Sequence, residues 1–280
     1  MPPVYLNHVY RVLDAETFRA AEASEYLRTA FASFESRTTK SGDDAWTGLY
    51  YYGESTYFEL LSADPKRGRP VGQSGVALGV EEPGTSARVR KALDALGLGD
   101  AKTLERTRET GGKMVPWFGM TGFAPTDPIL VSWVMEYSPS FLKQWHPELR
   151  PGLSGISRRV VLERYQAKAA LTVPPRDPLF RNVTGIRLAL DPGRAESFGR
   201  ELAALGFRKD ATGSAAGRAG GGNLSWLGPD VRIDIVPAGE MRGIVAIQMA
   251  LTRKPEEEKV LELPGARLEV RTDGTASFLF

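Results

Sequence analysis

The feature of this sequence that most constrains its fold is an internal repeat. The same opening, an alternating strand-like segment followed by a helix-like segment, occurs at Leu6–Ala23, Ser74–Gly97 and Val183–Gly206. A fourth opening, Gly243–Arg253, has the strand but no good helix after it. One such unit cannot bury its own apolar face, so repeats of this kind are expected to pack against one another.

Further strand-like segments follow each opening and complete a strand–helix–strand–strand–strand (βαβββ) unit. The first unit closes with Trp46–Gly53 and Ser55–Pro65, the second with Ile129–Leu142, and the third with Asp230–Glu240. The glycine-rich run 213–223 lacks the G-K-[ST] ending of a phosphate-binding loop. We interpret that run as a flexible hairpin connection.

The repeats predict an α+β fold, in which repeated βαβββ modules form two curved mixed β-sheets. Helices 15–23, 86–96 and 193–205 are expected on the outer faces of these sheets. Residues 1–142 would hold an N-terminal pair of modules, and residues 180–280 a degenerate C-terminal pair. Residues 143–179 would connect the two pairs and include a strand-like segment, 158–165. We expect the N-terminal pair to carry the function.

Composition narrows the chemistry. With 36 Lys and Arg against 34 Asp and Glu, the formal net charge is +2, which gives no electrostatic case for nucleic acid or an anionic membrane as partner. The absence of cysteine excludes disulfides, Cys-ligated zinc and iron–sulfur clusters, and only two histidines, His8 and His146, are present. The N-terminus lacks the features of a secretory signal, and prolines interrupt the longest weakly charged stretch, so we expect a cytoplasmic protein.

Aligning the repeats brings a few chemistry-bearing residues to matched positions. His8, Gly75 and Gly185 fall at one position of the opening strands. Glu59 and Asp234 fall at one position of the closing strands, and Glu136 is the carboxylate of the second closing strand. Glu59 and Glu136 have apolar neighbours, and a buried carboxylate needs a charged partner or a shifted pKa. The alternative for each is a strand-end carboxylate that reaches solvent.

Paired βαβββ units resemble the vicinal oxygen chelate superfamily, which includes glyoxalase I, extradiol dioxygenases, and fosfomycin- and bleomycin-resistance proteins. The segments that carry the resemblance are Asn7–Tyr10, Tyr57–Leu60, Gly75 and Val134–Tyr137. The resemblance implies metal ligands on the first and last strands of each unit, facing into a cup between paired units.

Carried over to this sequence, the implied ligands are His8, Glu59 and Glu136, with Gly75 at the fourth position. Such a donor set suits a divalent Fe, Mn, Ni, Co or Zn ion. The glycine departs from the family, which very often has histidine there. Gln73, two residues earlier on the same strand face, could substitute weakly.

The remaining candidate residues would surround the metal. Glu59, Glu136 and His146 are candidate catalytic groups. His146 could fold over the mouth of the cup, or it could be an ordinary surface residue. The candidate substrate-binding residues are Tyr10, Tyr50, Tyr52, Gln73, Trp117 and Trp133. The aromatic members favour a flat or aromatic ligand if they line a cup, and otherwise fill the core.

The resemblance implies a metal-dependent enzyme of isomerase, lyase or dioxygenase type, whose small-molecule substrate chelates the metal through oxygens. The alternative is a metal-free binding, sequestration or antibiotic-resistance protein with the same cup. A third reading is a structural or interaction module. The sequence is compatible with a homodimer and does not determine the oligomeric state. The C-terminal pair, with Gly185 and Asp234 at the matched positions, is expected to hold no metal.

Overall fold

Two eight-stranded β-sheets dominate the computed structural model, which describes residues 2–41, 44–110, 112–124, 129–147, 157–210 and 223–280. The first sheet contains β1 (Tyr5–Leu13), β2 (Ser33–Ser41), β3 (Asp44–Tyr52), β4 (Tyr57–Ser62), β5 (Ser74–Gly79), β6 (Lys102–Thr110), β7 (Lys113–Gly122) and β8 (Leu130–Tyr137). The second contains β9 (Phe180–Leu190), β10 (Arg208–Lys209), β11 (Leu224–Leu227), β12 (Arg232–Pro237), β13 (Gly243–Leu251), β14 (Lys259–Leu263), β15 (Ala266–Val270) and β16 (Thr275–Leu279). The helical segments are α1 (Ala15–Ala23), η1 (Tyr26–Phe31), η2 (Pro65–Arg67), α2 (Thr85–Asp94), α3 (Pro139–Trp145), α4 (Arg158–Ala170) and α5 (Pro192–Ala204).

The strand order follows the repeat. In the first sheet the order is β2-β3-β4-β1-β5-β8-β7-β6, so the two opening strands β1 and β5 lie side by side and antiparallel. Each opening strand pairs in parallel with the closing strand of its own unit, β1 with β4 and β5 with β8. The helix between the first two strands of a unit supplies the crossover that this parallel pairing requires. The predicted α+β fold of paired modules in two mixed sheets is therefore confirmed.

The reduced fourth unit shows what the missing helix changes. The third unit repeats the pattern, because β9 and β12 are parallel. In the fourth unit the chain passes from β13 to β14 without a helix. The chain therefore reverses its direction one time fewer than in the other units before it reaches its closing strand. The closing strand β16 consequently runs antiparallel to β13, while the strand order β13-β16-β15-β14 is kept.

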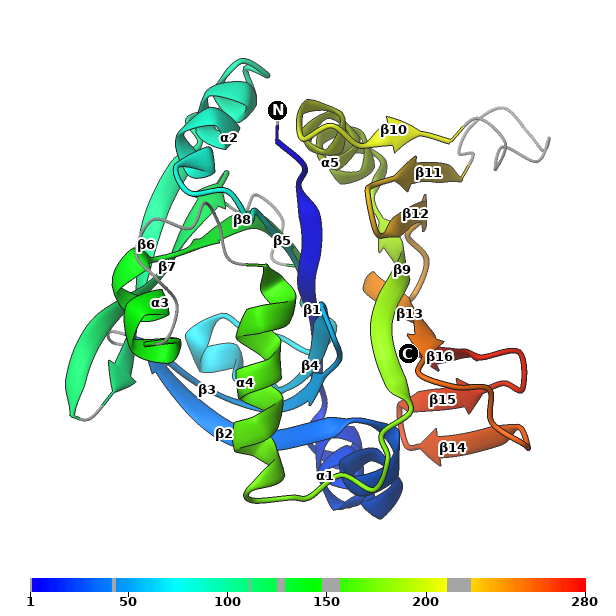
Figure 1. Cartoon of the computed structure of the whole chain (residues 1–280). Coiled ribbons are helices and arrows are strands. Elements are labelled where there is room, and N and C mark those ends of the chain that lie inside the picture. The colour runs from blue at the N-terminus through cyan, green and yellow to red at the C-terminus, as the bar shows by residue number, and fades with distance from the viewer. Residues whose placement is uncertain (1, 42–43, 111, 125–128, 148–156, 211–222) are drawn as a thin grey trace.

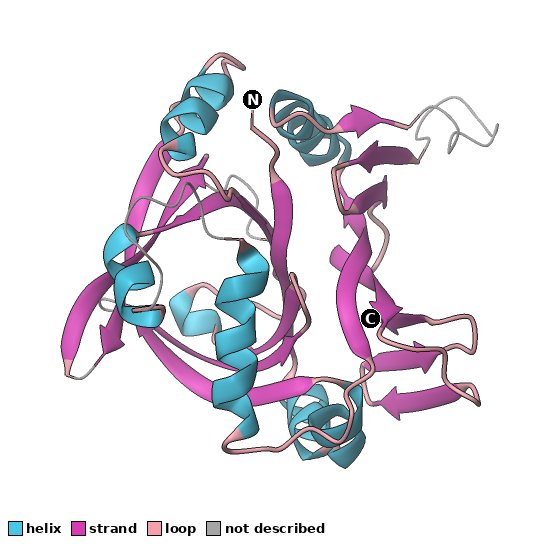
Figure 2. Ribbon diagram, in the orientation of Figure 1, coloured by secondary structure: helices cyan, strands magenta, loops and turns pink. Residues whose placement is uncertain are grey.

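The first sheet curls until its edge strands β2 and β6 contact each other, so that its eight strands form a nearly closed barrel (Figure 1). The convex face of this barrel packs against the second sheet, with α1, α2 and α5 at the ends of the same layer (Figure 2). Fully buried apolar residues fill this layer, among them Val9, Val76, Ile186, Ile247 and Phe278.

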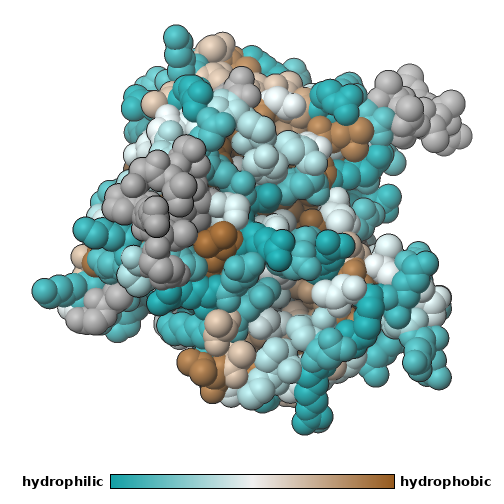
Figure 3. All heavy atoms as spheres, in the orientation of Figure 1, coloured by the Kyte–Doolittle hydropathy of each residue, from teal (hydrophilic) through white to brown (hydrophobic). Residues whose placement is uncertain are grey.

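Helices α3 and α4 cover the concave face of the barrel. Phe141 of α3 and Leu162 and Tyr165 of α4 belong to one buried cluster with barrel residues such as Tyr52 and Trp117. The outer surface on this side is mostly hydrophilic, with small apolar patches (Figure 3). The segment expected to be a connection is therefore, in its described part, a plug for one end of the barrel.

Three sequence interpretations need correction. The strand expected at 158–165 is helix α4, which Ser157 caps by accepting the Val160 N–H at 3.3 Å. Its buried residues Val161, Leu162, Tyr165 and Ala169 recur at helical spacing. The strand expected over Ile129–Leu142 ends at Tyr137, because Ser138 caps α3. Strand β2, rich in polar residues, was not anticipated.

The glycine-rich run 213–223 lies, apart from Asn223, outside the described residues. Within the part of the chain that the structure describes, no helix is long and apolar enough to cross a membrane.

Candidate functional site

A buried histidine and a buried glutamate meet on the inner wall of the barrel. His8 on β1 lies opposite Tyr57 on β4, and Tyr10 lies opposite Glu59, so all four side chains share the concave face. His8 Nε2 is 3.7 Å from Glu59 Oε1. The two residues are only 5% and 6% exposed. The predicted meeting of these two residues is thus present in the structure.

His8 is held by its neighbours in one orientation. Its Nδ1 lies 2.9 Å from Asn7 Oδ1, which as a carbonyl oxygen accepts the ring proton. The lone pair of Nε2 then faces Glu59. The His8 ring stacks on Tyr57 with centroids 4.5 Å apart and meets Trp133 edge-on at 5.5 Å. Burial lowers the pKa of His8 from 6.5 to about 3, so the ring is neutral at physiological pH.

Glu59 is also uncharged near neutral pH. Burial raises the pKa of its carboxyl from 4.5 to about 8, while the charge of Arg37 and a hydrogen bond with Tyr57 lower it by less. The separation of 3.7 Å between His8 and Glu59 is longer than a hydrogen bond. The pair therefore consists of a neutral carboxylic acid that can donate a proton and a neutral imidazole that can accept one.

The candidate substrate-binding residues surround this pair. The Tyr10 hydroxyl donates to Gln73 Oε1 at 3.4 Å, and the Tyr10 ring lies 6.2 Å from that of Trp133. The indole N–H group of Trp133 is buried and has no hydrogen-bond partner among the described residues. Buried donors without acceptors are costly in a folded protein, and a ligand that carries an acceptor would satisfy them.

Tyr50 and Tyr52 have partners within the barrel wall. The Tyr50 hydroxyl accepts from Trp46 Nε1 at 2.9 Å, and the Tyr52 hydroxyl donates to Glu35 at 2.6 Å. The rings of Tyr50 and Tyr52 stack 6.2 Å apart. Both residues line the inner wall, as their predicted role requires, but their polar ends are already engaged.

The structure does not bring Glu136 to the pair. His8 lies opposite Tyr57, and Gly75 lies opposite Val131, so the register makes Trp133 and not Glu136 the counterpart of Glu59. Glu136 is three residues beyond Trp133 and points to the other face of the sheet. The alignment of Glu136 with Glu59 is therefore wrong.

Glu136 instead holds the start of helix α2. Its carboxylate accepts the N–H groups of Gly84 and Ser86 at 2.6 and 2.8 Å. The first N–H groups of a helix have no partner within the helix, and a negative charge is favourable at that end.

The ring of Tyr10 fills the fourth ligand position. A Cβ atom added at Gly75 would lie 2.0 Å from Tyr10 Cε1, so no side chain fits at residue 75 while Tyr10 keeps this place. Among the described residues, no group of three or more His, Asp or Glu side chains could hold a metal ion. With His8 and Glu59 as the two donors, the site does not fit the divalent ion that the resemblance implies.

His146 lies at the end of α3, within the plug that α3 and α4 form. It is buried, and its Nε2 is 2.8 Å from the backbone oxygen of Val160 in α4. This contact joins the two helices of the plug.

A comparison with models of protein families gives a match over almost the whole chain. A model described as "Family of unknown function (DUF5829)" matches residues 6–280. The chain belongs to this family. A comparison of this DUF5829 sequence with curated proteins gave no match. Among solved structures, a hypothetical protein from Staphylococcus aureus is similar with a TM-score of 0.53 and 10% identity, over 96% of this chain and 98% of that chain. This likeness shows a shared fold.

Two enzymes are similar at lower scores. A mutant of 4-hydroxymandelate synthase from Streptomyces coelicolor has a TM-score of 0.44 and 12% identity, over 86% of this chain and 65% of that one. Glyoxalase I from Zea mays has a TM-score of 0.36 and 14% identity, over 83% and 67% of the two chains. Neither likeness carries an argument about function.

We expect Glu136→Ala to lower the free energy of unfolding by about 1 kcal/mol, because it removes the acceptor for two helix N–H groups. Ligand binding in the barrel should be unchanged, since Glu136 faces the other side of the sheet. Urea denaturation measures the first effect, with the exposed Glu82→Ala as control. If Glu136→Ala abolished ligand binding without changing stability, Glu136 would be part of the binding site after all.

Proposed function

We propose that the barrel of the first sheet binds a small organic molecule against His8 and Glu59, with the protonated Glu59 as hydrogen-bond donor. The observation that carries this proposal is the uncharged carboxyl–imidazole pair, 3.7 Å apart, on the inner wall of the barrel. A buried carboxyl with a strongly raised pKa contributes poorly to stability and is typical of a functional site. The aromatic side chains of Tyr10, Tyr57 and Trp133 would hold a flat ligand.

The proposal differs from the metal-dependent enzyme that the family resemblance implies. Only His8 and Glu59 of the implied ligands share the inner wall, and the Tyr10 ring covers Gly75. A metal ion would stabilise negative charge on a ligand oxygen. In this proposal two neutral hydrogen-bond donors do so instead, the Glu59 carboxyl and the indole N–H of Trp133. The function is thus closest to the metal-free small-molecule binding alternative of the sequence analysis.

A second candidate function is an enzyme that moves a proton, and the raised pKa of Glu59 favours it. An acid with a pKa of about 8 is close to the pH at which general acids work best. Glu59 would donate its proton to a ligand oxygen, and the resulting carboxylate would take a proton back from a ligand carbon. The isomerase and lyase types belong to this candidate.

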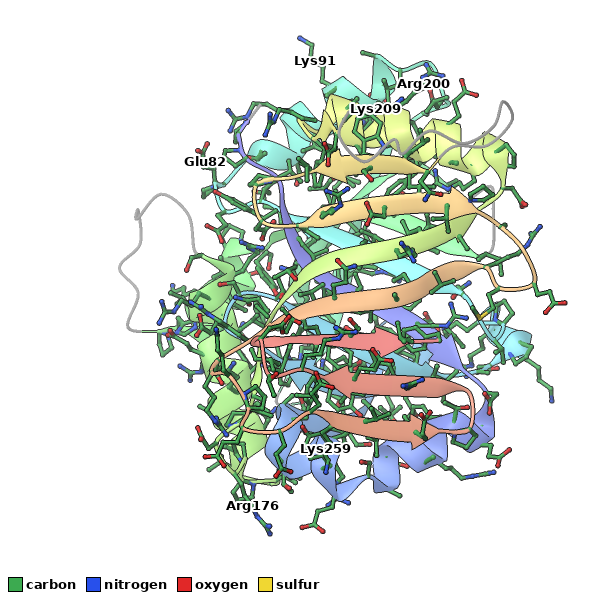
Figure 4. All side chains as sticks on the ribbon, turned by 90° about the vertical axis from the view of Figure 1, so that its right-hand side faces the viewer. Glu82, Lys91, Arg176, Arg200, Lys209 and Lys259 are labelled. Carbon is green, nitrogen blue, oxygen red and sulfur yellow. The ribbon has the colours of Figure 1, made fainter. Side chains whose placement is uncertain are left out.

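The matched residue of the second sheet provides a control for the experiment. Asp234 lies opposite Arg187 and two residues after Arg232, which places it at the position of Glu59. It is ion-paired with Arg232 at 2.9 Å and accepts from Ser225 at 2.6 Å. Ile233 and Ile235, on either side of Asp234 in β12, belong to the core between the two sheets, so Asp234 lies on the opposite face of the second sheet, which faces the viewer in Figure 4. Substitution of Asp234 therefore leaves the barrel untouched.

We expect Glu59→Met to weaken binding of neutral aromatic amides at least tenfold, because the buried donor is lost, and Asp234→Leu to change binding less than threefold. Titration of tryptophan fluorescence with benzamide, phenylacetamide and 4-hydroxybenzamide measures both. The proposal fails if neither these amides nor the carboxylate 4-hydroxybenzoate binds, or if Asp234→Leu is the more damaging. A stoichiometric metal that His8→Ala removes, after reconstitution with Fe(II), Mn(II), Ni(II) or Zn(II), would restore the metal-dependent enzyme.

A further inference from the structure

The edge strand β6 sends two arginines into the barrel. Arg106 lies opposite Phe118, which itself lies opposite Tyr137 on the inner wall. Arg108 lies further along the same strand, and its guanidinium is 5.3–5.5 Å from the ring centroids of Trp117, Trp145 and Tyr165. Both cations thus belong to the interior and not to the outer surface.

The charges of the inner wall do not balance. Arg37 is neutralised by Glu35, whose carboxylate lies 2.7 Å away. The other described acid of the wall, Glu59, is largely uncharged below a pH of about 8. Neither Arg106 nor Arg108 forms an ion pair with a carboxylate in the described part of the chain. Among the described residues, these two partly buried arginines therefore have no carboxylate partner, and an anion that entered the barrel could pair with one of them.

The two arginines differ in what they are free to bind. Arg108 donates to the Tyr165 hydroxyl at 2.6 Å and lies among aromatic rings, so it is committed to the plug. Arg106 is half-buried and has no hydrogen-bond or ion-pair partner among the described side chains. A guanidinium in this state has five N–H donors available in a planar fork, which matches a carboxylate.

Arg106 also lies near the candidate site. Burial and the Glu59 carboxyl raise the pKa of Tyr10, whereas Arg69 and Arg106 lower it. Tyr10 is therefore within electrostatic reach of both Glu59 and Arg106. An occupant that lies against Tyr10 would have the neutral donor Glu59 and the cation Arg106 within electrostatic reach.

We propose that the ligand of the barrel is an aromatic carboxylate whose carboxylate group pairs with Arg106 and whose ring lies against Tyr10 and Trp133. This inference rests on the proposed binding function and names the class of its ligand. A charge-assisted, bidentate arginine–carboxylate pair in a site shielded from water supplies affinity and orientation together. A neutral ligand of the same shape would leave Arg106 without a counter-charge.

The test uses two probes of the same shape, 4-hydroxybenzoate and 4-hydroxybenzamide. We expect the unaltered protein to bind the carboxylate at least tenfold more tightly than the amide. Arg106→Gln should weaken carboxylate binding at least tenfold and amide binding less than threefold, while Arg106→Lys retains part of the preference. Arg90→Gln, at an exposed position on α2, is the control for net charge and should leave both affinities unchanged.

The outcomes separate the two proposals. Equal affinity for both probes overturns the inference of an anionic ligand and leaves the binding function standing. Failure of both probes to bind overturns the binding function and this inference with it. If Arg106→Gln weakens both probes equally, Arg106 holds the wall in shape and does not recognise a carboxylate, and the inference is again wrong. Thermal denaturation of each variant shows that the compared proteins are equally folded.

Discussion

Glu59→Gln is expected to stabilise the folded protein by about 3 kcal/mol at pH 7, since one pKa unit corresponds to about 1.4 kcal/mol. The pKa of Glu59 is raised from 4.5 to about 8 by burial. Between these values the folded protein holds a proton that the unfolded chain releases, so stability falls as pH rises through this window. Glutamine has nearly the same shape and no charge to bury, and the loss should disappear.

The pH profile gives a sharper signature than the value at one pH. The pKa of His8 is lowered from 6.5 to about 3, so the stability that depends on neutral His8 is lost as pH falls below 6.5. In the unaltered protein, between pH 4.5 and 6.5, His8 makes the free energy of unfolding rise with pH while Glu59 makes it fall. Between pH 6.5 and 8 only the fall caused by Glu59 remains. The profile of Glu59→Gln should instead rise to pH 6.5 and then become flat with respect to these two groups.

Urea denaturation at pH 5, 7 and 8 measures this difference, with Asp234→Asn as the matched control. Asp234 is ion-paired with Arg232 on the face turned away from the barrel, so its substitution should bring no gain in stability. Parallel profiles for Glu59→Gln and the unaltered protein would show that Glu59 is ionised in the folded state. The neutral donor of the proposed function would then be excluded.

The cost in stability of a buried Glu59 carboxyl agrees with the role in binding that we propose for it. Proteins commonly give up stability at the groups that bind or react, because such groups must stay unpaired until the ligand arrives. Glu59 and Arg106 both fit this description. Counting the described residues alone, the buried Glu59 has no cation at hydrogen-bond distance, and the half-buried Arg106 has no anion. These two groups are the reason that we propose the barrel interior as the functional region of the molecule.

The sequence predicts the two-sheet fold because each unit carries its own pattern of alternation. The closing strands Tyr57–Ser62 and Arg232–Pro237 align without gaps, and the structure places Glu59 and Asp234 at equivalent register positions. The closing strand of the second unit, which carries Glu136, could not be aligned so well. An error of one residue in a strand moves a side chain to the other face, and Glu136 was assigned to the face that Trp133 and Met135 occupy.

The plug and the arginines could not be predicted in the same way. The first turns of α4 are rich in arginine and β-branched residues, and a short segment of this kind fits a strand as well as a helix. Strand β6 has few apolar residues, so nothing in its sequence distinguishes the inward Arg106 from the outward Glu105. Which arginine lacks a partner depends on contacts between strands that are distant in sequence.

Arg158→Met is expected to lower the free energy of unfolding by about 3–5 kcal/mol, because it leaves two carboxylates without their cation. Arg158 is the first residue of α4, and its side chain is only 9% exposed. Its guanidinium bonds Glu81 at 3.1 Å, Asp230 at 2.7 Å and the backbone oxygen of Leu6. A cation at the start of a helix opposes the helix dipole, so these three partners account for its presence there.

Arg159→Met is the matched control, since the side chain of this neighbouring arginine is 64% exposed and its ion-pair partner among the described residues is Glu163 on the same helix. Its loss should cost less than about 1 kcal/mol. Because Arg158 ties the plug to β1 and to the loop before β12, Arg158→Met should also loosen the plug and open the barrel to solvent. Quenching of the tryptophan fluorescence by acrylamide at pH 7, without denaturant, should therefore increase for Arg158→Met and not for Arg159→Met. Equal losses of stability in the two variants would show that the carboxylates around Arg158 are solvated without it, and that the plug is held by its apolar contacts with the barrel wall alone.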